Sequence, residues 1–104
     1  MNAAALASAI EQAIAYLGSV GETQWSRRLS ELRSTVDADP GNAARELMDA
    51  LPELGQLYLT TKSGHDVSRA QEMPCNMKLS ALRQQLYFMA EKQLAEQPEQ
   101  EKAR

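Results

Sequence analysis

Residues 23–41 read TQWSRRLSELRSTVDADPG, and this segment gives the clearest indication of a helical fold. Its large apolar residues are four, three and four positions apart, so they share one face of a helix. The following Asp39-Pro40-Gly41 is typical of one helix ending and another beginning, with Asp39 as N-cap and Pro40 as first helical residue. Thr23 is the expected N-cap of the earlier helix. The apolar residues of this first face are Trp25, Leu29, Leu32 and Val36.

Apolar residues at three-to-four spacing continue on both sides of this stretch. They predict an N-terminal helix over about residues 2–18 and a last helix over about residues 74–96, with Pro74 at its start. The helix that begins at Pro40 is expected to end near residue 51, because Pro52 disfavours its continuation. Between Pro52 and Pro74 the periodicity is lost, which predicts a long loop without a paired strand.

The sequence therefore predicts an all-α protein. We expect a compact four-helix bundle or an orthogonal helical array, with one long loop between the third and fourth helices. A single helical domain is expected over residues 1–96, followed by a flexible polar tail over residues 97–104. Two residues of the second helix and two of the fourth lie in the middle of their apolar faces and are expected to pack together: Trp25 and Leu29 against Leu82 and Leu86.

The composition argues against several classes of protein. Eleven Lys and Arg against fourteen Asp and Glu give a net charge of −3, whereas a nucleic-acid-binding domain usually has a strong basic excess. No apolar run approaches the ~20 residues of a membrane span, and no signal-peptide pattern is recognised, so we expect a cytoplasmic protein. A single cysteine, Cys75, excludes an internal disulfide.

No pattern of residues predicts catalysis, a cofactor or a metal ion. His65, Asp66, Glu72 and Cys75 are close in sequence, but a zinc site normally brings two or more His or Cys residues, and this group has one of each. Cys75 shares the helical face of Leu79, which favours a small core residue over a nucleophile. We therefore expect neither an enzyme nor a cofactor- or metal-binding protein.

The candidate binding residues begin with an acidic stripe. Glu46, Asp49 and Glu53 are three and four positions apart, so a helix that reaches Glu53 presents them on one face. Such a stripe is either the solvated side of the helix or a patch for a basic partner. The long loop follows directly, and we expect its residues Tyr58, His65 and Asp66 to lie beside the stripe and to extend the binding surface.

Phe88 is a further candidate contact residue. It lies about 180° from Leu79 around the last helix, on the face that should point away from the core. We expect the long loop to cover Phe88, and the alternative is that a partner protein covers it.

Two sequence patterns resemble a family of small bacterial helical domains of unknown function. They are Gly21-Glu22-x-x-Trp25-x-x-x-Leu29 and Leu79-x-x-Leu82-Arg83-x-x-Leu86-Tyr87. The chain departs from the family pattern at the turn after the third helix, which here reads Pro52-Glu53-Leu54-Gly55-Gln56. Small acidic domains of this kind resemble the immunity proteins that bacteria encode beside interbacterial toxins.

The resemblance and the composition together lead to one expected function and one alternative. The expected function is an immunity protein that binds a cognate toxin and occludes it. Its partner would be a basic protein that acts on nucleic acid or nucleotides, because the substrate clefts of such proteins are basic. We expect it to act as a monomer. The alternative is a secretion chaperone or adaptor that holds an amphipathic segment of a partner protein.

Overall fold

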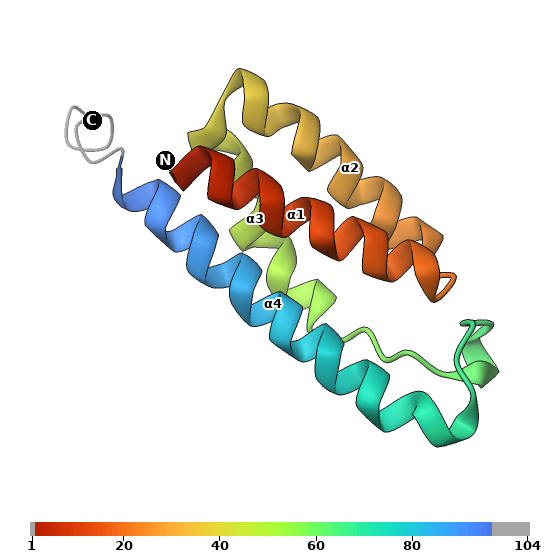
Figure 1. Cartoon of the computed structure of the whole chain (residues 1–104). Coiled ribbons are helices and arrows are strands. Elements are labelled where there is room, and N and C mark those ends of the chain that lie inside the picture. Colours follow the sequence, from red (N-terminus) through yellow and green to blue (C-terminus); the bar gives the residue numbers. More distant parts are fainter. Residues whose placement is uncertain (1, 97–104) are drawn as a thin grey trace.

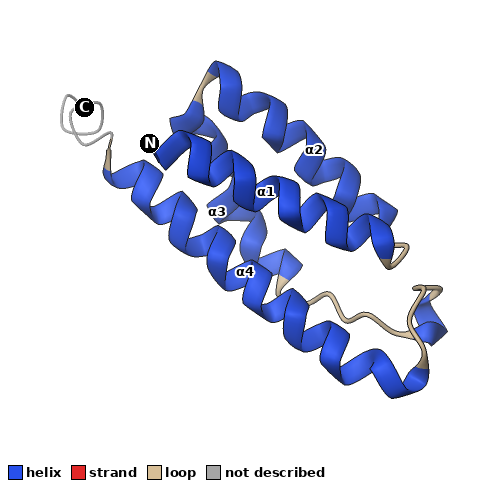
Figure 2. Ribbon diagram, viewed as in Figure 1, coloured by secondary structure: helices blue, strands red, loops and turns tan. Residues whose placement is uncertain are grey.

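The computed structural model describes residues 2–96, and the tail predicted for residues 97–104 lies outside this part. It contains four α-helices and two short 3₁₀ turns, and no strand occurs in the part described (Figure 2). The prediction of an all-α fold is confirmed. The helices are α1 (Asn2–Ser19), α2 (Thr23–Ala38), α3 (Pro40–Leu54) and α4 (Glu72–Ala95), and the turns are η1 (Thr61–Ser63) and η2 (Arg69–Gln71).

The helices form a four-helix bundle in which each helix packs closely on two neighbours (Figure 1). The close pairs are α1–α2, α2–α3, α3–α4 and α1–α4, so α2 and α4 lie diagonally across the bundle. The expected packing of α2 on α4 is therefore not a contact between neighbouring helices. Leu29 and Leu86 are both buried in the shared core, whereas Leu82 is only half-buried.

The core consists mainly of leucine and alanine. The four apolar residues that define the predicted face of α2 are all buried, as the spacing predicts. Small residues occupy many of the contacts between helices and allow close approach of their backbones. The largest side chains with almost no exposed surface are Leu6, Ile10, Leu17, Leu29, Leu47, Leu54, Leu59 and Leu86.

The ends of three helices differ from the prediction in part. Asp39 caps α3 as expected, because its side chain accepts a hydrogen bond from the Asn42 N–H at 3.1 Å. The N-cap of α2 is Glu22 and not Thr23. Helix α3 continues past Pro52 to Leu54, whose side chain is 1% exposed; its burial offsets the hydrogen bond that Pro52 cannot make.

Helix α4 begins at Glu72, two residues before the expected start at Pro74. Pro74 is tolerated there because the first four N–H groups of a helix have no partner inside the helix. Its neighbour Cys75 is half-buried and packs against the core, in agreement with a structural role.

Tyr16 joins α1 to the first turns of α4. Its hydroxyl group donates a hydrogen bond to the carbonyl oxygen of Cys75 at 2.8 Å, and the Lys78 ammonium lies 4.9 Å from the centre of its ring. Burial and the neighbouring Cys75 raise the pKa of the Tyr16 phenol to about 12. The neutral phenol is therefore the form that the folded protein stabilises.

Stability is accordingly expected to fall in strong alkali because of Tyr16. The phenol has an ordinary pKa of 10.0 in the unfolded chain and about 12 in the folded protein. Between these values the unfolded chain releases the proton and the folded protein keeps it, so a rising pH favours unfolding; below this window the contribution is complete. Melting temperatures measured across the window should decline less steeply for Tyr16→Phe. An equally steep decline in that variant would contradict the assignment.

Candidate partner-binding surfaces

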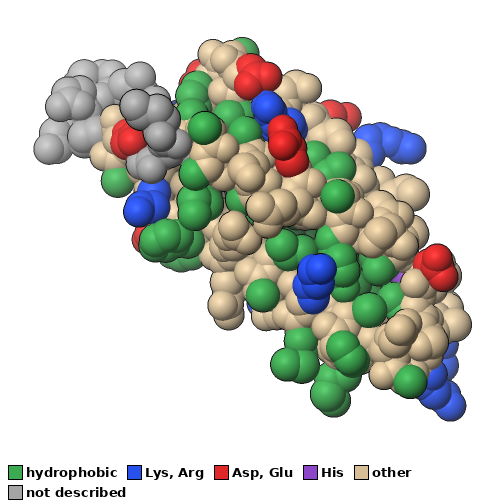
Figure 3. Space-filling model, in the orientation of Figure 1, with side chains coloured by type: hydrophobic (Ala, Val, Ile, Leu, Met, Phe, Trp, Pro, Cys, Tyr) green, Lys and Arg blue, Asp and Glu red, His purple; other side chains and the backbone are tan. Residues whose placement is uncertain are grey.

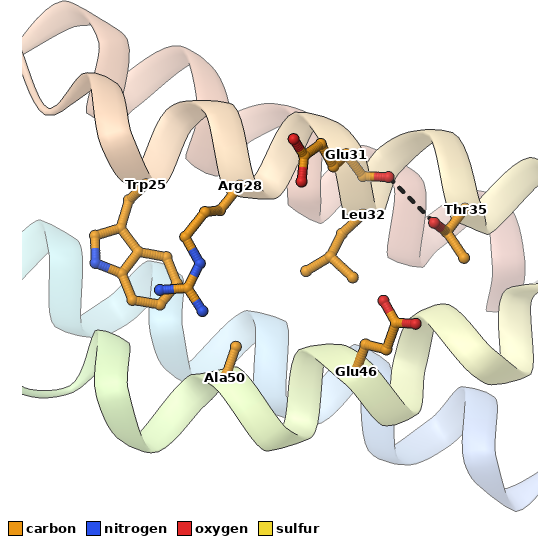
Figure 4. Close-up of a pocket in the computed structure, with 7 residues that line it drawn as sticks. All are labelled: Trp25, Arg28, Glu31, Leu32, Thr35, Glu46 and Ala50. Carbon is orange, nitrogen blue, oxygen red and sulfur yellow. Dashed lines mark hydrogen bonds between the residues drawn. The ribbon is translucent and has the colours of Figure 1, made fainter.

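The first candidate surface is a cleft between α2 and α3 (Figure 4). Its volume is about 350 Å³. Leu32 and Ala50 contribute apolar surface from the two helices, and Glu46 points from α3 toward α2. The residues that line the cleft are Trp25, Arg28, Glu31, Leu32, Thr35, Glu46 and Ala50.

One end of this cleft is closed by a stacked cation. The Arg28 guanidinium lies 4.0 Å from the centre of the Trp25 ring, and its Nη1 atom is 3.2 Å from Oε2 of Glu53 on α3. Trp25 itself is buried, as predicted, while both partners of the ion pair are exposed enough for solvent to screen their attraction. The contact fixes the position of Arg28 more than it stabilises the fold.

The three acids of the predicted stripe differ in their hydrogen-bond and ion-pair partners. Glu53 is paired with Arg28, and Glu46 accepts a hydrogen bond from the Asn42 side chain at 2.9 Å. Asp49 is exposed on α3. Glu31 of α2 adds a carboxylate that the sequence analysis did not single out. Within residues 2–96, neither Glu31, Glu46 nor Asp49 forms an ion pair, so this side of the bundle keeps negative charge.

The loop after α3 begins next to Glu53, the last acid of this stripe. It leaves the end of α3 and runs away from it toward the turn between α1 and α2 (Figure 1). The Asp66 N–H donates to the carbonyl oxygen of Val20 at 2.7 Å, next to Gly21, whose φ of 81° favours glycine. Glu46 lies about 12 Å along the axis of α3 from its last residue, Leu54. The loop therefore adjoins the stripe at its Glu53 end, whereas Glu46 lies farther along α3.

His65 is buried, so it does not extend an exposed binding surface as the sequence predicts. The residue is 9% exposed, and its Nε2 atom lies 2.7 Å from Oε1 of Glu22. The Thr60 N–H donates to Nδ1 at 3.1 Å, which places the ring proton on Nε2, where it is donated to Glu22. The other Glu22 oxygen, Oε2, accepts from the Trp25 N–H at 3.2 Å. We call this arrangement of Glu22, His65 and Thr60 the loop clamp.

A second set of contacts holds the loop against α4. The Asn76 side chain accepts from the Leu59 N–H at 2.7 Å and donates to the Leu59 carbonyl oxygen at 2.8 Å, as a neighbouring strand would. Glu72 accepts from the Thr60 hydroxyl group at 3.0 Å. Leu59 and Val67 are buried beneath these contacts, which leaves Tyr58 and Asp66 as the exposed candidate contact residues of the loop.

The second candidate surface is the outer face of α4. The expectation that the loop covers Phe88 is wrong, because the loop packs near the start of α4 and Phe88 is 51% exposed. Lys92 of the same helix lies over its ring, with Nζ at 4.9 Å from the ring centre. The exposed large apolar residues of α4, which we call the α4 stripe, are Met73, Met77, Tyr87 and Phe88.

Met73 and Met77 were missed from the sequence although a signal was present. Exposed positions of α4 recur every three or four residues, and apolar residues occupy several of them as well as the buried face. One apolar side of α4 packs on the core of this small bundle. An apolar opposite side indicates a second contact, with another molecule. Figure 3 shows hydrophobic side chains along α4 on this side of the molecule.

Two further features concern metal binding and membrane spanning. Over residues 2–96, no three His, Cys, Asp or Glu residues are grouped closely enough to hold a metal ion. In the same range no helix has the length and apolar character needed to cross a bilayer.

Comparisons with known protein families, with curated proteins and with solved structures find no match to the chain.

Proposed function

We propose that this protein is a binding module without catalysis of its own, and that it is an immunity protein that occludes a cognate bacterial toxin. The observation that supports this proposal most is the acidic α2–α3 side of the bundle. There Glu31, Glu46 and Asp49 keep their charge free of ion pairs among the described residues. Glu31 and Glu46 flank a cleft of about 350 Å³ whose walls include the apolar Leu32 and Ala50.

This surface suits a basic side chain of a partner protein. The carboxylates of Glu31 and Glu46 attract a Lys or Arg head group, and Leu32 and Ala50 provide apolar surface for its aliphatic stem. A toxin that acts on nucleic acid or nucleotides carries such basic residues in its substrate cleft. Binding there excludes the substrate, and inhibition requires no chemical step.

Reversing two charges of this surface should slow binding. Glu46→Lys with Asp49→Lys is expected to lower the association rate constant for the candidate toxin about tenfold or more at low ionic strength. The double variant should also lose affinity less steeply with added salt, because less attraction remains to be screened. Surface plasmon resonance at several salt concentrations measures both quantities.

A matched control keeps this test specific. Both substituted positions are exposed, so circular dichroism should show unchanged folding. Glu96→Lys reverses a single exposed acid after the end of α4 and should affect the rate less than Glu46→Lys alone. Parent-like association of the double variant at low salt would exclude the α2–α3 surface. Failure to rescue growth when the protein is co-expressed with the toxin would reject the proposed function itself.

The α4 stripe favours a second candidate function. A secretion chaperone or adaptor needs an apolar surface for an amphipathic segment, and the stripe offers one along a helix of 24 residues. The two functions predict opposite results for the same variants. Binding of an adaptor's partner would survive the charge reversals on α3 and would be lost when Met77 or Phe88 is made polar.

A further inference from the structure

The α4 stripe runs along most of one helix face. From Met73 to Phe88 it spans 16 residues, about 22 Å along the helix axis. Met73 and Met77 are 70% and 66% exposed, and Tyr87 and Phe88 are 48% and 51% exposed. Monomeric proteins rarely leave so many large apolar side chains in contact with water on a single helix. We therefore expect another molecule to cover the α4 stripe.

The order of residues along the stripe is complementary to itself. Methionines occupy one end and aromatic rings the other, with the small residues Ser80 and Ala81 between them. When a second α4 is laid antiparallel with Ala81 opposite Gln84, each Met77 comes opposite the Phe88 of the other copy. Thioether sulfur and aromatic rings make favourable contacts, and the two-fold axis produces each contact twice.

The flanking charges also favour antiparallel packing of the two helices. Arg69, Glu72 and Lys78 lie at or near the start of α4, which gives that end one net positive charge. Glu91, Lys92 and Glu96 lie at or near its end and give one net negative charge. Antiparallel packing brings the basic end of one copy to the acidic end of the other, whereas parallel packing places like charges together. The small residues in the middle of the stripe allow the two helices to approach closely near the axis.

The area is sufficient for a specific contact. The four large side chains together expose on the order of 500 Å². The intervening small residues and the aliphatic stems of Lys78 and Lys92 bring the face close to the roughly 800 Å² per partner of a standard interface. We propose that the outer face of α4 is the interface of a symmetric antiparallel homodimer of this protein.

This arrangement replaces the monomer expected from the sequence and leaves the acidic surface available. Because α2 and α4 lie diagonally in the bundle, a dimer formed through α4 keeps the α2–α3 cleft of each copy facing outward. The dimer thus goes beyond the proposed function, and its test requires no toxin.

The test is the mass of the isolated protein in solution. Sedimentation equilibrium of the full chain should give a reversible dimer of twice the 11.5 kDa chain mass at micromolar concentrations. Met77→Lys and Phe88→Glu should each yield monomers, because each places a charge against an apolar side chain of the other copy. Gln24→Lys adds a charge on α2, at an exposed position away from α4, and should remain dimeric. A monomeric parent over the whole concentration range would overturn the proposal and leave the stripe to a different protein.

The double variant Met77→Lys with Phe88→Glu tests the antiparallel register. In one chain these positions are 11 residues apart, about 16 Å, too far to pair with each other. In the proposed dimer each lysine faces a glutamate of the other copy, so the double variant should regain at least tenfold in dimerisation constant over either single variant. In a parallel dimer lysine faces lysine and no recovery occurs; that result would overturn the arrangement. Circular dichroism of each variant verifies that the bundle is folded.

Discussion

Leu86→Ala is expected to lower the free energy of unfolding by about 2–5 kcal/mol, a large share of the stability of a domain of this size. The Leu86 side chain is 1% exposed and lies in the core of the bundle, so its truncation removes buried surface and leaves a cavity. Urea unfolding followed by circular dichroism measures the loss. A melting temperature within a degree or two of the parent would show that Leu86 does not belong to the core.

Leu82→Ala is the matched control for this prediction. The two leucines lie four positions apart on α4, and the same substitution at the half-buried Leu82 should cost about 1–2 kcal/mol. Sequence spacing alone ranks both residues as core. A loss at Leu82 as large as that at Leu86 would contradict the partial burial of Leu82.

His65→Ala is expected to cost about 2–4 kcal/mol, an unusually large effect for a loop residue. The substitution leaves Oε1 of Glu22, whose side chain is 11% exposed, without its His65 partner and leaves the Thr60 N–H without an acceptor. The loop should then detach from the turn between α1 and α2. Trypsin cleavage after Lys62 and Arg69, which are both exposed, should become faster together with the loss of stability.

Asp66→Ala provides the comparison for this variant. Asp66 is adjacent to His65 and contributes its backbone N–H to the contact with Val20, while its side chain is exposed. Its replacement should change stability by less than about 0.5 kcal/mol. Equal losses in the two variants would show that the loop responds to any substitution and that the clamp has no special role.

The helices could be predicted because their apolar spacing directly reflects their packing. Trp25, Leu29, Leu32 and Val36 are all buried, since a helix packed on one side must have its apolar residues on that side. Asp39 was also predictable, because an N-cap forms with residues three positions away. The end of α3 was not, since the burial of Leu54 is a tertiary effect that outweighs the local preference of Pro52.

The loop could not be predicted for a related reason. Leu59 and Val67 are buried without any periodic spacing, and Asn76 takes the place of a strand that the sequence does not contain. The loop clamp joins residues 43 positions apart. Nothing near Glu22 or His65 in the sequence indicates this contact, so His65 was expected to extend the binding surface of the loop.

The candidate binding surfaces were predicted in part. Glu46 and Asp49 are exposed and Phe88 is uncovered, which their helical phases indicate. The pairing of Glu53 with Arg28 depends on the relative placement of α2 and α3, which spacing within one helix does not reveal. Met73 was overlooked because the last helix was expected to begin after it.

Glu22 uses its two carboxylate oxygens for different parts of the fold. One oxygen caps the first turn of α2 through the Trp25 N–H, and the other holds His65 of the loop. A fluctuation that moves this carboxylate breaks both contacts at once. The first turn of α2 and the loop around His65 should therefore open as one cooperative unit, so their amide protons would exchange with solvent at matched free energies, below that of global unfolding.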